Sequence, residues 1–232
     1  YEDVTNIDSV GIVTARAGVN VSGGQLLVGT GVTIGVAGIA TFRSGRIDVG
    51  DALLNTSIGQ NAGDAVTTAT GNVAVGVNAL TALTTGNYNV GVGEDALIAN
   101  TGGNNNIAIG RYALKTNTTA NAATAVGSYA LKSNTTGYNV TALGYEALEE
   151  NTTGANNTAL GHMTLALNTT GANNTAVGKG ALDVNTTGNN NVAVGYDALD
   201  ASTTADNNTA IGYAALGANT TGASNVAVGY QA

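Results

Sequence analysis

Tyrosine and aspartate side chains recur at fixed places in this sequence, and together they could hold the rings of a sugar. Four tyrosines each directly follow a glycine of a seventeen-residue repeat, and two aspartates lie close to one of them. A tyrosine ring combines an apolar face with a polar tip, which suits such a contact. The residues of this predicted recognition stripe are Tyr145, Tyr196, Asp197, Asp200, Tyr213 and Tyr230. The same rings could instead cover a groove between chains or pack lengthwise as a ladder.

Residues suited to catalysis are scarce in this chain. It contains no cysteine and a single histidine, His162. His162 stands where other repeats have tyrosine, arginine, lysine, serine or glutamate, which indicates a surface side chain. A Ser/His constellation or a metal-hydrolase site therefore has little to draw on. We predict no catalytic, cofactor-binding or metal-binding residues and no enzymatic activity.

Three further motifs resemble binding signals, but the repeat explains them better. The run Gly91–Ala96 matches part of a dinucleotide fingerprint, yet it lies within a repeat rather than between a strand and a helix. Acidic groups such as Glu146, Glu149 and Glu150 could bind Ca²⁺, but the Gly-Gly-x-Gly-x-Asp calcium coil is absent, which favours a solvated face. Glycosylation sequons occupy the turn of several repeats, where asparagine is a turn residue. They begin at Asn117, Asn134, Asn151, Asn168, Asn185 and Asn219.

The element that positions all these residues is the repeat itself. We number each repeat from its glycine, as position 0, to position 16. The glycines are Gly59, Gly76, Gly93, Gly110, Gly127, Gly144, Gly161, Gly178, Gly195, Gly212 and Gly229. Position 3 is almost always alanine, position 4 is leucine from Leu80 to Leu216, and positions 7 to 10 usually read Asn-Thr-Thr-Gly. A period this strict over most of a chain predicts a solenoid with one coil per repeat.

Each coil is expected to contain β-strands and turns rather than helix. The triplet at positions 14 to 16, as in Val192–Val194, alternates with period two and is rich in β-branched residues. The Asn-Thr-Thr-Gly and Asn-Asn clusters predict turns, because asparagine and glycine tolerate positive φ. We expect a second short strand around the Ala-Leu pair of positions 3 and 4. A helix is excluded, because every glycine in it would cost about 1 kcal/mol.

Charge indicates which positions face water. All fourteen charged residues from residue 59 onward fall at positions 1, 2, 5, 6 or 11. Unpaired charges are almost never buried, so these positions form the outer surface. The interior is then thin: we expect leucine at position 4 and the residues at 14 and 16 inside, with the alanine rows at 3 and 15 left as apolar stripes. Exposed stripes mark interfaces, so we predict a homotrimer, with a dimer as the alternative. Ten coils at about 4.8 Å each make a rod of roughly 50 Å.

Composition narrows the classes of function. The chain has 232 residues, no proline and a formal net charge of −8. Proline would interrupt a backbone ladder, and an acidic chain lacks the basic patch that binds nucleic acid. No apolar run approaches the roughly 20 residues of a membrane span, so we expect no membrane insertion. Residues 1–50 lack the period and consist of short strands broken by glycine, which predicts a fibrous β stem before a solenoid of about ten coils over residues 51–232.

Two resemblances cover nearly the whole chain. The segment Asn190–Leu199 resembles the head repeat of trimeric autotransporter adhesins, although the coil of that family is usually shorter. That resemblance implies a left-handed parallel β-roll, trimeric and bound to host surfaces. The segments Asp3–Arg16 and Val28–Ile34, together with the Asn-Thr-Thr-Gly coils, resemble fibre and other structural proteins of marine, especially cyanobacterial, phages.

The predicted architecture is thus an all-β parallel β-solenoid, or β-roll, of seventeen-residue coils, in which no cofactor is expected. The predicted function is a structural segment of a virion fibre, located on the virion surface, that serves as a rigid trimeric rod for spacing or for attachment to a host glycan or receptor. The alternative is a bacterial surface adhesin or extracellular filament subunit. An ice-binding solenoid is disfavoured because adjacent threonines at positions 8 and 9 point opposite ways. An acyltransferase-type helix needs three hexapeptides per coil, where one fits.

Overall fold

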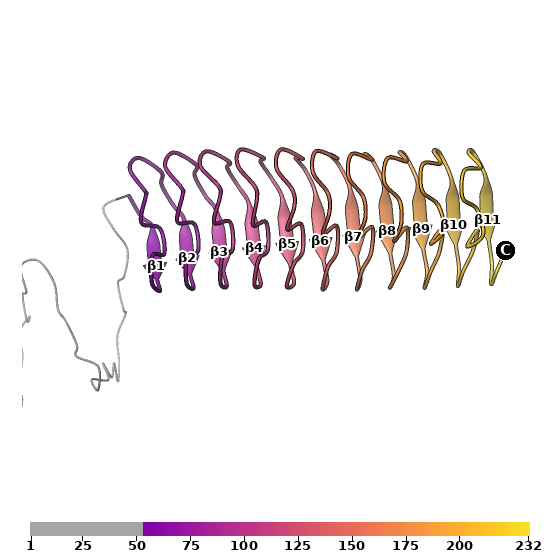
Figure 1. Ribbon diagram of the computed structural model, residues 1–232, viewed down its shortest axis with the longest axis horizontal. Helices are drawn as coiled ribbons and strands as arrows, with labels where there is room; N and C mark the ends of the chain where they lie inside the picture. The colour runs from indigo at the N-terminus through magenta and orange to yellow at the C-terminus, as the bar shows by residue number, and fades with distance from the viewer. Residues whose placement is uncertain (1–52) are drawn as a thin grey trace, which may run out of the picture. The chain divides into compact units, whose positions relative to one another are not determined.

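The computed structural model describes residues 53–232, which form one β-solenoid (Figure 1). Eleven three-residue strands make a single parallel sheet in which sequence order and spatial order are the same. The strands are β1 (Thr56–Ile58), β2 (Val73–Val75), β3 (Val90–Val92), β4 (Ile107–Ile109), β5 (Thr124–Val126), β6 (Thr141–Leu143), β7 (Thr158–Leu160), β8 (Thr175–Val177), β9 (Val192–Val194), β10 (Thr209–Ile211) and β11 (Val226–Val228). The predicted solenoid of about ten coils is confirmed. The stem predicted for residues 1–50 lies outside the described residues.

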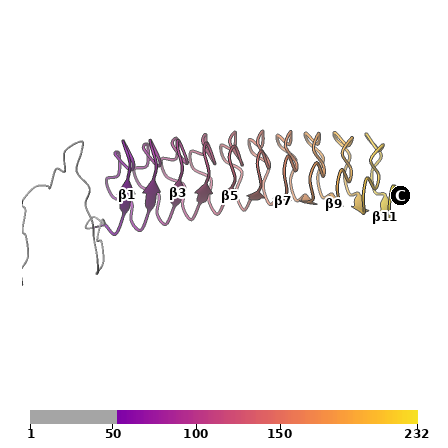
Figure 2. The same cartoon turned by 90° about the horizontal axis from the view of Figure 1, so that it is seen from below.

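Successive coils stack without any slip in register. Each strand pairs with residues seventeen positions away, as Thr124 does with Thr141 and Thr141 with Thr158. The turns are stacked in the same way: the backbone N–H of Leu80 donates to the carbonyl of Ala96 at 3.0 Å, and that of Leu148 to Thr164 at 3.0 Å. Figure 2, seen from below, shows the coils as a row of similar narrow loops. Nearly every part of a coil forms backbone hydrogen bonds with the next coil. Proline, which has no backbone N–H to donate, would therefore fit poorly here.

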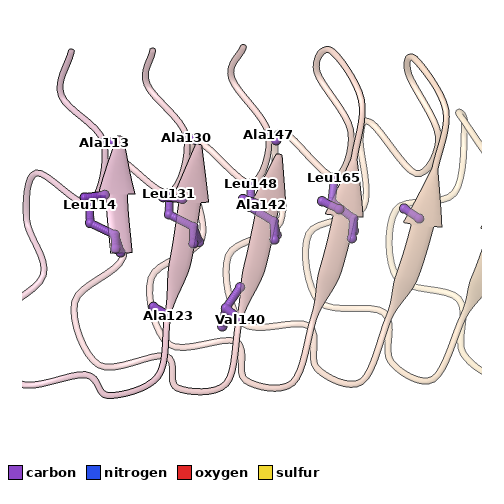
Figure 3. Close-up of a cluster of buried hydrophobic side chains, with 14 of the residues drawn as sticks. Ala113, Leu114, Ala123, Ala130, Leu131, Val140, Ala142, Ala147, Leu148 and Leu165 are labelled. Carbon is purple, nitrogen blue, oxygen red and sulfur yellow. The ribbon is translucent and has the colours of Figure 1, made fainter. Parts of the chain in front are cut away.

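The core is a column of leucines enclosed by two columns of alanine. The leucines at position 4 from Leu80 to Leu199 are fully buried, and so are nearly all alanines at positions 3 and 15. Figure 3 shows Leu114, Leu131, Leu148 and Leu165 following one another behind the strands. Burying one leucine side chain contributes about 2 kcal/mol. A single coil therefore gains too little to be stable alone, and the stack as a whole supplies the stability.

The alanine rows were predicted to be exposed, and that prediction is wrong. Ala142 and Ala193, at position 15, have 0% of their surface exposed within a single chain. The residues at positions 14 and 16 point outward instead, as shown by Ile107 at 38% and Leu143 at 48% exposure. The reason is the width of the coil: leucine fills most of the interior, and only the small methyl group of alanine fits between it and the sheet.

The second strand predicted around the Ala-Leu pair is also absent from the described coils. This segment is a turn, and its leucines have positive φ, for example 53° at Leu80 and 52° at Leu148. Left-handed backbone at a leucine costs about 1 kcal/mol. The positive φ recurs because the chain must reverse direction within a few residues. At the same time the leucine side chain must point inward and its backbone N–H must donate to the next coil.

Two columns of buried asparagine hold the turns together. At position 7, Asn151 Nδ2 donates to Asn134 Oδ1 at 2.8 Å and to the Gly154 carbonyl at 3.0 Å, and Asn168 Nδ2 repeats this contact to Asn151 Oδ1 at 2.7 Å. At position 13, the backbone N–H of Asn89 donates to Asn72 Oδ1 at 2.8 Å. Buried amides that find partners in this way specify the register of the stack, because a shifted coil would leave them unpaired.

The asparagine column at position 7 also decides the question of the sequons. Asn117, Asn134, Asn151, Asn168 and Asn185 are fully buried. Their Nδ2 atoms, to which a glycan would be attached, donate hydrogen bonds inside the coil. These five asparagines are therefore structural residues and inaccessible in the folded chain. Asn219, in the last turn, donates the same kind of hydrogen bond to the Gly222 carbonyl but is only partly buried.

Glycines at positions 0 and 10 serve different purposes, which corrects the expectation that the turn glycine provides positive φ. Gly144, at position 0, has φ of 141°, whereas no positive φ occurs at Gly137, at position 10. A Cβ on Gly137 would lie 2.5 Å from the carbonyl oxygen of Gly154. Position 10 is thus small because the next coil passes close by, and positive φ in that turn occurs at position 12, for example at Asn139 with 54°.

Candidate functional site

The sheet ends at position 0, and the side chains that follow it form one long edge of the solenoid. We call this the aromatic edge. It contains Tyr112 and Tyr129 at position 2, and Tyr145, Tyr196, Tyr213 and Tyr230 at position 1, as well as His162 and Lys179 at position 1. Because coils stack in register, equivalent side chains come close to one another on successive coils.

The aromatic rings pack lengthwise in two stacks. Tyr196 and Tyr213 are stacked with ring centroids 5.2 Å apart at 7°, and Tyr213 and Tyr230 follow at 5.1 Å and 13°. In the other stack, Tyr145 lies against His162 at 5.4 Å and 20°. Edge-to-face contacts extend this stack from Tyr145 through Tyr129 to Tyr112, at 5.9 Å and 5.4 Å. The lengthwise ladder, one of three interpretations of these tyrosines, is thus present in the folded chain.

Stacking changes what these rings can offer a ligand. Tyr213 has a tyrosine on each side, and Tyr196 has Tyr213 at 5.2 Å and the Lys179 ammonium at 5.2 Å from its ring centroid. A sugar stacks on the face of an aromatic ring, and these contacts use the faces within the chain. Tyr196 and Tyr213 remain 42% and 46% exposed. A receptor would therefore contact the rim of the ladder and its phenol oxygens.

At the end of the edge nearer the N-terminus, the cations are paired with carboxylates. Arg111 pairs with Glu94 at 2.9 Å, and its guanidinium carbon lies 4.2 Å from the centroid of the Tyr112 ring. Lys115 lies 4.1 Å from the same centroid, and Lys132 pairs with Glu149 at 2.8 Å. The hydrogen bonds that these cations donate to the carboxylates of Glu94 and Glu149 raise the pKa of Arg111 and of Lys132. Exposed ion pairs of this kind contribute little to stability. Arg111 also donates hydrogen bonds to the hydroxyl groups of Tyr112 at 2.8 Å and Tyr129 at 3.4 Å, which helps to orient these two rings.

The other end of the aromatic edge is acidic. Asp183, Asp197 and Asp200 lie on two neighbouring coils, and one carboxylate oxygen of Asp183 is buried without a hydrogen-bond partner among the described residues. Burial first, and then the charge of Asp197, raises the pKa of Asp183 and of Asp200. Within residues 53–232 no group of three or more histidine, aspartate or glutamate side chains is arranged to hold a metal ion.

Replacing Asp183 by asparagine is expected to stabilise the protein at pH 7. A carboxyl whose pKa is raised by folding disfavours the folded state when charged, and this loss disappears as the pH falls towards the unfolded value near 3.9. Thermal unfolding followed by circular dichroism should therefore show a midpoint a few degrees higher for Asp183→Asn at pH 7 and equal midpoints at about pH 3. Asp64→Asn, at an exposed site in the first coil, is the control. Equal midpoints at pH 7 would contradict the expected cost of burying the Asp183 charge.

The predicted recognition stripe is thus only partly one surface. Tyr196, Asp197, Tyr213 and Tyr230 come together at the acidic end, and Asp200 lies beside Asp197 and also lines a hollow at the last coil, formed with Leu216 and Asn219. Tyr145 belongs to the other stack. His162 and Lys179, which complete the two stacks, were not predicted as members. The signal was present in the repeat, because both occupy the same position 1 as the tyrosines.

No family model and no curated protein matches the chain. In the part of the chain that the structure describes, no helix is long and apolar enough to cross a membrane.

Proposed function

We propose that this chain is a stiff segment of a homotrimeric fibre on the surface of a virion, where it sets a distance or takes part in attachment to a host. The observation that carries the proposal is the uninterrupted stack from β1 to β11. Backbone, asparagine and threonine hydrogen bonds join neighbouring coils, as between Thr152 Oγ1 and the carbonyl of Thr169 at 2.9 Å. Bending or stretching such a stack requires several of these bonds to break together, which makes it stiff.

Electron microscopy of the full chain tests the rod, and labelling of virions tests its location. The solenoid should appear as a straight rod of roughly 50 Å, since parallel strands are about 4.8 Å apart. An antibody against the repeats should decorate intact virions. A compact particle would contradict the rod, and decoration of a bacterial surface instead would support the alternative of an adhesin or extracellular filament.

The proposed role is not enzymatic. In the described coils the one histidine, His162, lies on the surface with its ring stacked against Tyr145, so this ring acts as a member of the aromatic ladder. The aromatic edge supports the proposal in a second way: side chains there vary from coil to coil while the core positions are nearly constant, so the edge can change without disturbing the stack.

Attachment through the aromatic edge has its own test. Changing Tyr145, Tyr196, Tyr213 and Tyr230 together to serine should leave the fold intact and lower binding to host cells or to a glycan array by at least tenfold. The matched control changes Tyr88 and Tyr138 to serine; these side chains are 64% and 51% exposed and precede the strand rather than follow it. Unchanged binding by the folded tyrosine variant would restrict this segment to the role of a spacer.

A further inference from the structure

The outer surface of the sheet is a continuous uncharged strip that is mostly aliphatic. We call it the strand face; it consists of the outward residues at positions 14 and 16 of β1 to β11. All are valine, isoleucine, leucine or threonine. Several are well exposed in the single chain, including Ile107 at 38%, Ile211 at 41% and Leu143 at 48%. Figure 1 shows the strands side by side in one row, so the strip runs along the whole solenoid.

The strand face differs from the rest of the surface in its lack of charge. The charged residues from residue 59 onward occupy positions 1, 2, 5, 6 and 11, which leaves none on the strands. A folded chain that stayed alone in water would gain solubility from charges here, as it does on its other sides. Depletion of charge with retention of large aliphatic groups is the composition of the centre of a protein interface.

The strip is large enough to hold chains together. Its twenty-two outward side chains, two from each of eleven strands, at roughly one third exposure leave on the order of 1,000 Å² per chain, which exceeds the ~800 Å² that each partner contributes to a standard interface. Burying apolar area of this size contributes far more than the association of a transient complex requires.

The repeat spacing identifies the partner. Side chains on the strand face recur once per coil, at the ~4.8 Å spacing of parallel strands, over eleven coils. A surface with any other spacing would lose its fit within a few coils, whereas a second copy with the same coil height keeps it from end to end. We propose that the strand face is the surface through which copies of this chain pack lengthwise against one another, coil beside coil. The inference rests on the proposed trimeric fibre. The strand face takes the place of the alanine rows, which were predicted as the interface but are buried within the single chain.

Two outward leucines in the middle of the strip allow a direct test. The full chain with Leu143→Asp and Leu160→Asp should keep the circular dichroism of the parent protein and sediment as a monomer, whereas the parent protein sediments as a trimer. The control is Glu150→Lys, at the exposed position 6, which should remain trimeric.

The outcomes separate the interface from the proposed function. A trimeric parent with an equally stable trimeric double variant would place the interface elsewhere and leave the fibre proposal standing. A monomeric parent at 22.7 kDa would overturn both.

A labelling experiment keeps the inference testable if the aspartates prevent folding. Because the chain contains no cysteine, Leu143→Cys and Glu150→Cys each introduce a single thiol. In the assembled protein, maleimide should react at least tenfold more slowly at Cys introduced for Leu143 than at Cys introduced for Glu150. Both side chains are exposed in the single chain, so equal rates would overturn the inference.

Discussion

Replacing Ala142 by aspartate should abolish folding of the coils around β6. Ala142 is fully buried and lies in the middle of the strand, where it pairs with Ala125 and Ala159. The new carboxylate would face the leucine column of the core, shown by Leu131 and Leu148 in Figure 3, with no cation within it. An unpaired buried charge costs several kcal/mol, which is comparable to the whole stability of a domain.

The measurement is thermal unfolding and limited proteolysis of the full chain. For Ala142→Asp we expect the cooperative thermal transition to be lost. We also expect protease to cleave the coils in the middle of the stack, because each coil is stabilised only by its neighbours. Ala155→Asp is the matched control: it makes the same substitution at position 11, where the side chain is half-buried and where a later coil has Asp206. A native-like transition for Ala142→Asp would contradict the inward orientation of position 15.

Replacing Gly144 by alanine is expected to destabilise the solenoid by 3 kcal/mol or more, about the cost of a strained backbone plus a steric clash. Gly144 has φ of 141°, a region that residues with a side chain rarely adopt. An added Cβ would also clash with the carbonyl oxygen of Gly161 on the next coil. Since that oxygen belongs to the backbone of an adjacent coil held by the ladder, it cannot move away without disturbing the stack.

Gly102→Ala is the control for this substitution. Gly102 has no positive φ, and the nearest atom to an added Cβ is Thr85 Oγ1 at 3.4 Å. Most other coils have threonine at the same position 9, so alanine should be tolerated and could stabilise by about 0.5 kcal/mol through the loss of unfolded-state freedom. Urea unfolding of both variants checks the pair. A Gly144→Ala protein as stable as Gly102→Ala would show that position 0 does not require glycine.

The period and chemistry of the repeat predicted most of the architecture. Glycines seventeen residues apart predicted one coil per repeat, and β-branched triplets predicted one strand in each, both of which the structure confirms. The leucine at position 4 was predicted in the core because it recurs without a polar replacement from Leu80 to Leu216, and all but the last are fully buried. Because each position is observed in about ten repeats, an exception in one coil does not obscure the residue type that the position requires.

The arrangement of the tyrosines and of the asparagines was harder to predict. Whether Tyr213 offers its face to a sugar or stacks on Tyr196 depends on the orientation of both rings, which the repeat spacing alone does not determine. The asparagines of the sequons were expected as turn residues, but their burial in a column, as at Asn151, follows from how the turns close over the coil.

The sequence by itself determined that this chain stacks in register, with leucine inside and charge outside, because both follow from which residue types recur at which position. The orientation of the strand triplet was decided only in three dimensions. Alternation assigns Ala142 and Leu143 to opposite faces, but both faces are apolar, so hydrophobicity alone cannot say which one is buried. The volume of the coil decides it: with Leu148 already inside, there is room for a methyl group and no more, and the larger aliphatic side chains are left on the outside.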